Sequence, residues 1–326
     1  RREKLLFVIG VSFCRARVAS AIPYRREREY RMTYSPPKGK RMKRRTFLST
    51  FALAAAAPYL GCAPTMAGSA SAPRRLRRVG IQLYTLRDDA RRDLEGTLVN
   101  IAQAGYKDVE LLASMNNFGM PPERLRSILD RNGLRAPSTH VDVKVMDDLE
   151  RQIETAKILG HQYLIVASLP DGEHLGLDDY RRWADRFNEA GARALRSNMR
   201  LGFHNEAWDS RVIDGTTPYD VFVERTDPSV VALQLDTGNA AIGGKDPLDY
   251  MKRYGSRYSL FHIKDAPSIG ADHDVELGKG IIDFRRLLAS IDRIDEKVLY
   301  VEQETYPGVP LDSVRRDFAY ISTLEF

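Results

Sequence analysis

The 326-residue chain has only two cysteines, Cys14 and Cys62, and both lie near its start. The rest of the chain therefore cannot form a disulfide framework or a cysteine-ligated zinc site. The apolar run at 47–57 is shorter than the roughly 20 residues that a membrane-spanning helix needs. From residue 79 onward there is no G-x-G-x-x-G fingerprint and no Walker-type loop, which argues against a nucleotide-binding fold.

Positive charge is also missing from most of the chain. Residues 1–62 carry 15 Lys and Arg against 3 Asp and Glu, whereas the other 264 residues carry 35 against 41. The formal charge of +6 therefore belongs to the leader, and the body has a charge of −6. Nucleic-acid binding needs positive charge on the folded domain, so this distribution argues against it. A hydrophobic content of 43% with 29% charged residues is typical of globular proteins and excludes wholesale disorder.

The leader has the features of an export signal. Arg44-Arg45-Thr46-Phe47-Leu48 resembles a twin-arginine signal and precedes the short apolar run. Leu60-Gly61-Cys62 resembles the end of a lipoprotein box, although Tyr59 departs from that pattern. We therefore expect a bacterial protein exported to the periplasm or anchored to the envelope by lipid at Cys62. The alternative is an amphiphilic, disordered N-terminus. Residues 1–62 are predicted to be a disordered upstream segment with the export signal, and 63–78 a linker.

Eight short runs with strand character follow, several of them rich in Val, Ile, Leu and Tyr, as buried parallel strands are. They lie at 79–84, 107–112, 134–140, 162–168, 199–206, 230–236, 258–264 and 298–304. Amphipathic helical patterns separate them at 93–105, 121–132, 147–160, 177–198, 246–254 and 283–292. Eight strand–helix units in about 248 residues predict a (β/α)8 TIM barrel over 79–326. An open doubly wound sheet is the structural alternative.

Reactive groups in such a barrel lie at the C-terminal ends of the strands. Candidate metal ligands stand at the ends of four consecutive predicted strands. They are His204 and Glu206, Asp236, His262, and Glu302. Carboxylates gathered at this spacing would repel one another unless a cation neutralised them. The mixed oxygen and nitrogen donors suit one divalent ion: Mn²⁺, Mg²⁺, Co²⁺, Fe²⁺ or Zn²⁺.

Each of these residues also has a purely structural interpretation. A single histidine in a strand is more often a hydrogen-bonded core residue than a ligand. Asp236 could cap the following turn, and Glu302 could form an ion pair with Lys264. Four adjacent strands that end in ligand-type residues together favour the metal site. His161 and His174, away from the strand ends, are predicted to be surface residues.

Several motifs resemble one family. They include Gly80-Ile81-Gln82-Leu83-Tyr84, Ala104-Gly105-Tyr106, His204-Asn205, Asp236-Thr237-Gly238-Asn239, His262-Ile263-Lys264-Asp265 and Val301-Glu302-Gln303-Glu304. Over residues 79–326 the chain resembles the sugar phosphate isomerase/epimerase family, the xylose-isomerase-like barrels that also include endonuclease IV. The resemblance implies a (β/α)8 barrel with one divalent metal ion at the ends of strands five to eight.

Site roles follow from this resemblance. Asp236, His262 and Glu302 match three family ligands, and the fourth is Glu206 or His204. Glu206 is favoured because a hard cation prefers carboxylate oxygen, which leaves His204 as the candidate base. Lys264 is expected to donate to the developing oxyanion. The residues expected to contact substrate are Glu110, His140, Asp209 and His273.

The reaction implied by the resemblance is isomerisation or epimerisation of a keto-sugar, through proton abstraction next to the carbonyl and an enediolate. The alternative is a metal-dependent 3-keto-glycoside lyase or hydratase of the same fold. A non-catalytic sugar-binding barrel is less favoured because none of Asp236, His262 and Glu302 is lost, and a DNA-repair nuclease is disfavoured by the body's charge. Pro307 and Pro310 remove amide donors after the last strand, so an unphosphorylated sugar or keto-glycoside is expected.

Overall fold

The structure, a computed structural model, describes residues 73–326 apart from the side chain of Glu173. The predicted export signal, with its arginine pair and Cys62, lies outside the described residues. Within residues 73–326, no helix combines the length and apolar character needed to cross a bilayer.

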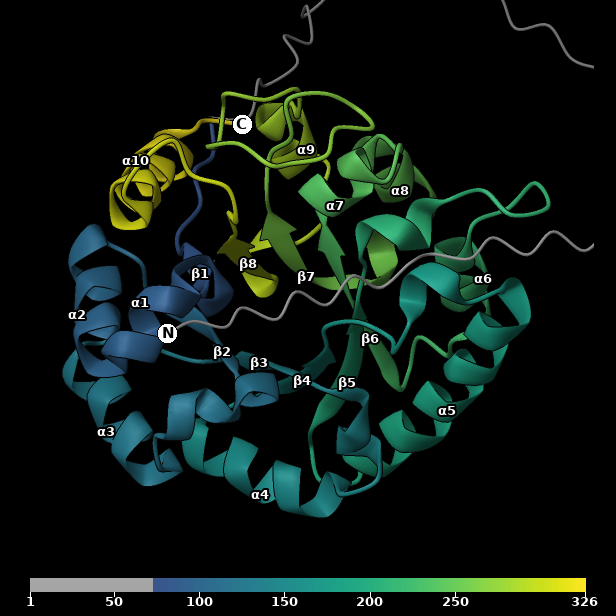
Figure 1. The fold of residues 1–326 in the computed structure, drawn as a ribbon, viewed down its shortest axis with the longest axis horizontal. Helices are drawn as coiled ribbons and strands as arrows, with labels where there is room; N and C mark the ends of the chain where they lie inside the picture. The colour runs from purple at the N-terminus through teal and green to yellow at the C-terminus, as the bar shows by residue number, and fades with distance from the viewer. Residues whose placement is uncertain (1–72) are drawn as a thin grey trace, which may run out of the picture. The chain divides into compact units, whose positions relative to one another are not determined.

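Eight parallel strands pair in chain order, and the last pairs with the first to close a barrel (Figure 1). The strands are β1 (Gly80–Gln82), β2 (Asp108–Leu112), β3 (Ser138–Val141), β4 (Tyr163–Val166), β5 (Arg200–His204), β6 (Val231–Asp236), β7 (Tyr258–Ile263) and β8 (Val298–Val301). Each lies within a run predicted from the sequence, except that β3 extends one residue beyond its run, to Val141. The TIM barrel is therefore confirmed, and the open-sheet alternative is excluded by the β1–β8 pairing.

Helices surround this barrel (Figure 1). They are α1 (Arg87–Arg92), α2 (Leu94–Ala104), α3 (Pro122–Arg131), α4 (Leu149–Leu159), α5 (Leu177–Leu195), α6 (Pro218–Arg225), α7 (Thr237–Ile242), α8 (Pro247–Tyr254), α9 (Phe284–Ala289) and α10 (Pro310–Thr323). The six predicted helices are present. The sequence analysis missed α1, α6, α7 and α10.

Local sequence signals explain where several helices begin and end. The Asp93 side chain accepts a hydrogen bond from the amide of Gly96 and caps the N-terminus of α2. Gly105 ends this helix with φ of 112°, and Gly160 ends α4 with φ of 81°, both in the left-handed region that glycine adopts without strain.

The lower interior of the barrel is filled by an apolar cluster of Ile165, Leu260 and Tyr300. Gly80 on β1 makes room for this cluster, because a Cβ there would lie 2.6 Å from Cδ1 of Tyr300. The larger apolar core includes residues of both the strands and the surrounding helices. Polar side chains occupy the interior above Tyr300, whose hydroxyl lies 2.6 Å from Oγ of Ser138.

Part of the predicted linker pairs with the end of the chain. The backbone of Arg74 exchanges two hydrogen bonds with that of Phe326, at 2.9 and 3.0 Å. Arg75 forms an ion pair with Glu325. The segment just before β1 is thereby attached to the C-terminus.

Candidate metal centre

Four side chains from neighbouring strands converge at the C-terminal end of the barrel: His204 ends β5, Asp236 ends β6, His262 lies on β7 and Glu302 follows β8. One potential ligand atom of each lies within 4.8 Å of the others, and all four residues are buried. Nε2 of His204 lies 3.5 Å from Oδ2 of Asp236, and Nδ1 of His262 lies 2.7 Å from Oε2 of Glu302.

The hydrogen bond of His204 shows which of its nitrogens faces the cluster. Its Nδ1 lies 3.0 Å from the carbonyl oxygen of Ala167, which can only accept, so Nδ1 carries the proton. Nε2 is then left with a lone pair directed toward Asp236. Within residues 73–326 this buried nitrogen has no hydrogen-bond partner, and neither has Oδ2 of Asp236.

Glu110 fixes the tautomer of His262 from the interior of the barrel, as the carbonyl oxygen of Ala167 does for His204. Its carboxylate accepts hydrogen bonds from Nε2 of Gln82, Oγ of Ser138 and Nε2 of Gln234. It also lies 2.6 Å from Nε2 of His262. Because an ionised carboxylate can only accept, this ring nitrogen donates to Glu110. Nδ1 of His262 is left to face Asp236 and Glu302, as in the carboxylate–histidine pairs that support metal ligands.

The electrostatics agree with an ionised Glu110. Burial alone would raise the pKa of its carboxyl, but the nearby His140 and His262 rings outweigh burial and lower this pKa to about 2. Burial would likewise lower the pKa of His262, yet Glu302 and Glu110 raise it well above its usual value. The carboxylates of the cluster therefore stabilise positive charge placed between them.

These donors fit a divalent cation. Nδ1–H of His204 and Nε2–H of His262 are committed outward, while Nδ1 of His262 shares a proton with Oε2 of Glu302 at 2.7 Å. A divalent cation would displace that shared proton, and two imidazole nitrogens and two carboxylates would then face one point. A buried carboxylate oxygen without a donor is costly, and a metal ion would supply the missing charge. Two nitrogen and two oxygen donors suit Zn²⁺, Fe²⁺, Co²⁺ or Mn²⁺. The group contains His204 where the sequence analysis favoured Glu206.

Lys264 lies behind the carboxylates. Its Nζ is 2.5 Å from Oε1 of Glu304 and 3.2 Å from Oδ1 of Asn239, with Asp236 and Glu302 at 3.7 and 3.8 Å. Gly238 leaves room for its side chain, since a Cβ there would lie 2.5 Å from Cγ of Lys264. Burial would lower the pKa of this amine, but the surrounding carboxylates raise it well above its usual value, so Lys264 is a cation.

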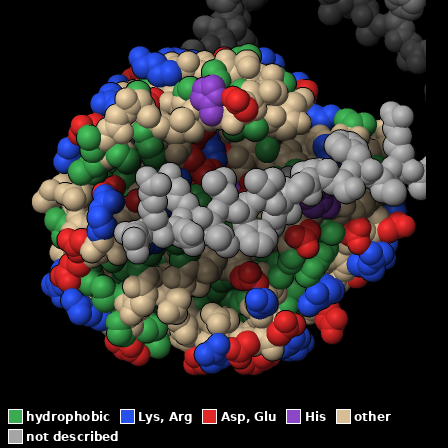
Figure 2. Space-filling model, in the orientation of Figure 1, with side chains coloured by type: hydrophobic (Ala, Val, Ile, Leu, Met, Phe, Trp, Pro, Cys, Tyr) green, Lys and Arg blue, Asp and Glu red, His purple; other side chains and the backbone are tan. Residues whose placement is uncertain are grey.

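A cavity of about 370 Å³ opens above the cluster. Figure 2 shows both acidic and basic side chains in a recess of the face in view, and charges of both signs are mixed around its rim. The cavity is lined by Tyr84, Leu112, Ser114, Met115, His140, Ala167, Ser168, His204, Glu206, Trp208, Asn239, Glu302 and Glu304. No lysine or arginine of residues 73–326 is among these lining residues, so the cavity suits an uncharged, hydroxylated ligand better than a phosphorylated one.

Glu206 lies on the cavity wall, outside the four-residue cluster. Its Oε2 accepts a hydrogen bond of 3.2 Å from Nδ2 of Asn239, a residue of α7. Asp236 caps the start of α7 by accepting from the amide of Asn239, as the structural interpretation of Asp236 proposed. Burial raises the pKa of the Glu206 carboxyl to about 7. His204 and Lys264 would lower this pKa, but burial and the nearby carboxylates of Asp209 and Asp236 outweigh them.

The residues predicted to bind substrate have different positions. His140 lines the cavity, and its Nε2 lies 2.9 Å from Oε1 of Gln234. Glu110 is fully buried beneath His262 and is not among the lining residues. Asp209 is also buried; it accepts from the hydroxyl of Tyr180 and from the amide of Glu206. His273 is exposed beside Asp272 and lines a separate cavity.

The surface position predicted for His161 is wrong. Its ring is buried, and Nδ1 lies 2.5 Å from the carbonyl oxygen of Ala136. The ring thereby supplies a donor to a backbone carbonyl just before the start of β3. His174, by contrast, is exposed.

Sequence reasoning also missed supporting residues that carry a visible signal. Gln234 is the one polar residue before Asp236 in an otherwise apolar strand, and it links Glu110 to His140. Asn205 joins the ends of β5 and β6, because its amide group pairs with both backbone groups of Asp236 at 2.8 and 3.1 Å.

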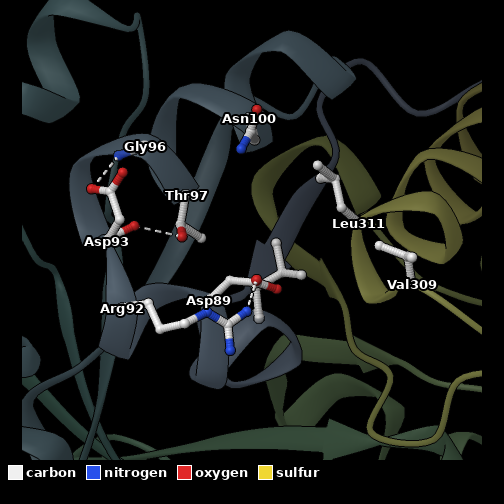
Figure 3. Close-up of a pocket in the computed structure, with 9 residues that line it drawn as sticks. Asp89, Arg92, Asp93, Gly96, Thr97, Asn100, Val309 and Leu311 are labelled. Carbon is white, nitrogen blue, oxygen red and sulfur yellow. Dashed lines mark hydrogen bonds and ion pairs between the residues drawn. The ribbon is translucent and has the colours of Figure 1, made fainter.

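Another pocket, of about 240 Å³, lies on the outer wall of the barrel between α2 and the start of α10 (Figure 3). Its charged groups are already engaged: Arg92 pairs with Asp89, and Asp93 caps α2. The metal-ligand cluster does not contribute to it.

Comparison with known proteins assigns the fold family. The family model described as "Xylose isomerase-like TIM barrel" matches residues 98–324, more than half of the chain. The chain belongs to this family. Among curated proteins, it is 26% identical over 257 residues to an inosose dehydratase from Geobacillus kaustophilus, covering 65% of this chain and 80% of that protein. Matches to other inosose dehydratases cover 66% or less of the relative.

Solved structures of the family show the same fold. A sugar phosphate isomerase/epimerase from Parabacteroides distasonis aligns with a TM-score of 0.64 and 24% identity, covering 78% of this chain and 98% of that one. A structure described as the IOLI protein with a bound zinc atom aligns with a TM-score of 0.60 and 16% identity, covering 76% and 98%. The resemblance seen in the sequence motifs is thus confirmed, and the chain is an enzyme of the xylose isomerase-like superfamily.

Proposed function

We propose that the protein is a metal-dependent enzyme that removes a proton next to the carbonyl of an uncharged keto-sugar and then eliminates water. The observation that carries this proposal is the convergence of His204, Asp236, His262 and Glu302 beneath a cavity lined by glutamates, with Nε2 of His204 and Oδ2 of Asp236 left without a hydrogen-bond partner among the described residues. The similarity to inosose dehydratases supports elimination over the isomerisation expected first from the sequence.

The four clustered residues would hold the metal ion. When bound, a divalent ion supplies positive charge that polarises a carbonyl oxygen and stabilises the enolate formed by proton removal. Lys264 holds Asn239 and Glu304 in place and offsets the negative charge of the carboxylates from behind. Because Lys264 does not line the cavity, its expected role as oxyanion donor stays a prediction.

Glu206 is the residue that we assign as the base. It lines the cavity, belongs to no metal-ligand group among the described residues, and is held by Asn239. This exchanges the roles that the sequence analysis favoured for Glu206 and His204. His204 cannot accept a substrate proton on Nδ1, which already donates to Ala167, and its Nε2 faces Asp236.

One carboxylate can serve both halves of the reaction. Glu206 takes the proton from the carbon beside the carbonyl, and the electron pair forms the enolate. If the carboxylic acid then protonates the hydroxyl on the next carbon, that group leaves as water and a double bond remains. If a second acid instead delivered a proton to the opposite face of that carbon, the outcome would be epimerisation. Product analysis therefore separates the two reactions.

The test uses the purified protein, depleted of metal and reloaded with Mn²⁺, Co²⁺, Fe²⁺, Mg²⁺ or Zn²⁺ in turn. An inosose and a panel of uncharged keto-sugars are incubated with it in D₂O and followed by NMR. We expect loss of the proton beside the carbonyl and appearance of a dehydrated product. Deuterium exchange with epimer formation would instead favour the isomerase/epimerase assignment. Absence of exchange with every metal and substrate would contradict the proposal.

A further inference from the structure

A second cavity adjoins the first at the C-terminal end of the barrel. Its volume is about 430 Å³, and it lies between the loop after β7 and the loop after β8. Its lining residues are His273, Asp274, Val275, Glu276, Lys279, Gln303, Thr305, Tyr306 and Pro307. None of these residues belongs to the metal-ligand cluster or lines the cavity above it.

The two cavities share a wall. Glu302 and Glu304 line the cavity above the metal-ligand cluster, whereas Gln303 and Thr305 line the second cavity. This alternation is that of an extended chain, whose successive side chains point to opposite sides. One segment of backbone therefore separates the two spaces, and the side chain of Glu304 is 39% exposed at its rim. A ligand in the first cavity can extend over this rim into the second.

The chemistry of the second cavity favours an uncharged ring. Val275, Tyr306 and Pro307 provide apolar walls. The hydroxyl of Tyr306 donates to backbone carbonyl oxygens of Thr85 and Gln303, which fixes the position of its ring. Apolar walls of this kind stabilise the face of a sugar or aromatic ring.

One polar atom in the wall requires a donor. Gln303 is only 1% exposed, and its Nε2 donates to the carbonyl oxygen of Thr305 at 2.6 Å. Its Oε1 is buried and has no hydrogen-bond partner within the described part of the chain. A buried acceptor without a partner costs free energy that a ligand hydroxyl would recover.

A phosphate group does not suit this place. The backbone amides of Glu304 and Thr305, which could bind an anion after the last strand, already donate to the carboxylate of Asp274. Asp274 is buried, and its carboxylate takes the hydrogen bonds that these two amides would otherwise donate to a bound phosphate. Lys279 lines the cavity, but Asp274 and Glu276 line it too.

We propose that the second cavity binds a hydroxylated ring attached to the reacting sugar, so that the preferred substrate is a two-part molecule such as a glycoside. This inference rests on the proposed function for the identity of the reacting part. Gln303 selects the hydroxyl, and the Val275–Tyr306–Pro307 wall selects the ring.

The test measures binding, without turnover, by calorimetry on the full-length, metal-loaded protein. The probes are the 4-hydroxyphenyl, phenyl and methyl β-D-glucosides. We expect the phenyl glucoside to bind about tenfold tighter than the methyl glucoside because of the buried ring. The 4-hydroxyphenyl glucoside should bind about fivefold tighter still, because it donates to Oε1 of Gln303.

Two variants assign these differences to separate groups. Gln303→Met should abolish the advantage of the hydroxyl and keep that of the ring. Val275→Trp should fill the cavity and make all three probes bind alike, without altering Gln303. Asn100→Ala, in the outer-wall pocket of Figure 3, is the control and should change neither difference. Unchanged metal content shows in each variant that the adjacent Glu302 is still in place.

The proposal is overturned if the three glucosides bind wild-type protein equally or not at all, or if Val275→Trp leaves the differences intact. It is also overturned if glucose 6-phosphate binds tighter than all three and Val275→Trp abolishes that binding, because the cavity would then be a phosphate site. A preserved order of affinities without proton exchange on any keto-sugar would contradict the proposed reaction and leave the role of this cavity standing.

Discussion

Nε2 of His262 lies 2.6 Å from Oε2 of Glu110, although 152 residues separate them in the chain. This contact connects a carboxylate on β2 to the candidate metal ligand on β7 across the interior of the barrel. It fixes the tautomer of His262, and thereby determines which nitrogen faces Asp236 and Glu302. The geometry of the metal centre therefore depends on a residue that touches neither the cavity nor the proposed ion.

The first prediction concerns this contact. Glu110→Gln replaces an acceptor of four donors with a group that also carries two N–H bonds. We expect divalent-metal affinity to fall about 10- to 100-fold and the free energy of unfolding to fall by about 2 kcal/mol. Competition with a chelator and urea denaturation measure the two effects. Glu123→Gln, on the exposed surface of α3, is the matched control and should change neither.

The second prediction separates the two residues at the end of β5. Glu206→Gln should keep the metal ion and reduce proton exchange by roughly 10²- to 10⁴-fold, because the base is lost. His204→Ala should weaken metal binding itself, because one ligand is lost. Metal analysis and deuterium exchange on both variants measure these outcomes. If Glu206→Gln loses the metal and His204→Ala retains it, the assignment reverts to the one favoured from the sequence.

The positions of Glu206 and Glu110 depend on the residue at which β5 and β2 end. If the strand continued through both residues, the alternation of side chains along it would place His204 and Glu206 on one face. In the structure β5 ends at His204, and Glu206 precedes the 3₁₀ turn Ala207–Ser210, so the alternation no longer applies. Glu110 was predicted to contact substrate but does not line the cavity, because it lies inside its strand and not beyond the strand's end. It lies two residues before the end of β2, one layer deeper than the cavity, and so contacts His262 instead of substrate.

Other features follow directly from the sequence or escape it for physical reasons. The strands were predictable because their side chains are buried on both sides of the sheet, which gives apolar runs such as Val231–Leu233. The start of α2 was also predictable, because the Asp93 side chain that caps it binds an amide only three residues away. His273 was not predictable, because it belongs to a long loop after β7 whose path no periodicity describes. The side chains that surround Asp236 come from three other strands, β5, β7 and β8, and their spacing depends on closure of the barrel.

The third prediction concerns the pH dependence of stability. Burial raises the pKa of Asp317 on α10 to about 7, and its Oδ2 has no hydrogen-bond partner among the described residues. In the unfolded chain this carboxyl ionises near its ordinary pKa of about 3.9. The folded state therefore binds the extra proton, and its stability falls as the pH rises from about 4 to about 7.

Asp317→Asn removes the buried charge and keeps an oxygen that accepts from the amide of Leu277, as Oδ1 does now at 2.9 Å. We expect the variant to be about 2 kcal/mol more stable than wild type at pH 8, with a smaller gain at pH 5. Urea denaturation at both pH values measures this. Asp312→Asn, exposed on the same helix, should show no such dependence. An equal effect of Asp317→Asn at both pH values would contradict the assigned pKa.

The central claim is that Asp236 is a ligand of one divalent metal ion, and metal analysis of wild-type protein beside Asp236→Ala tests it most directly. The account predicts about one divalent ion per chain in the wild type. In the variant it predicts loss of both the ion and proton exchange, with an unchanged far-ultraviolet circular dichroism spectrum. A wild-type protein that catalyses proton exchange after complete chelation, or an Asp236→Ala variant that keeps the ion at wild-type affinity, would contradict it.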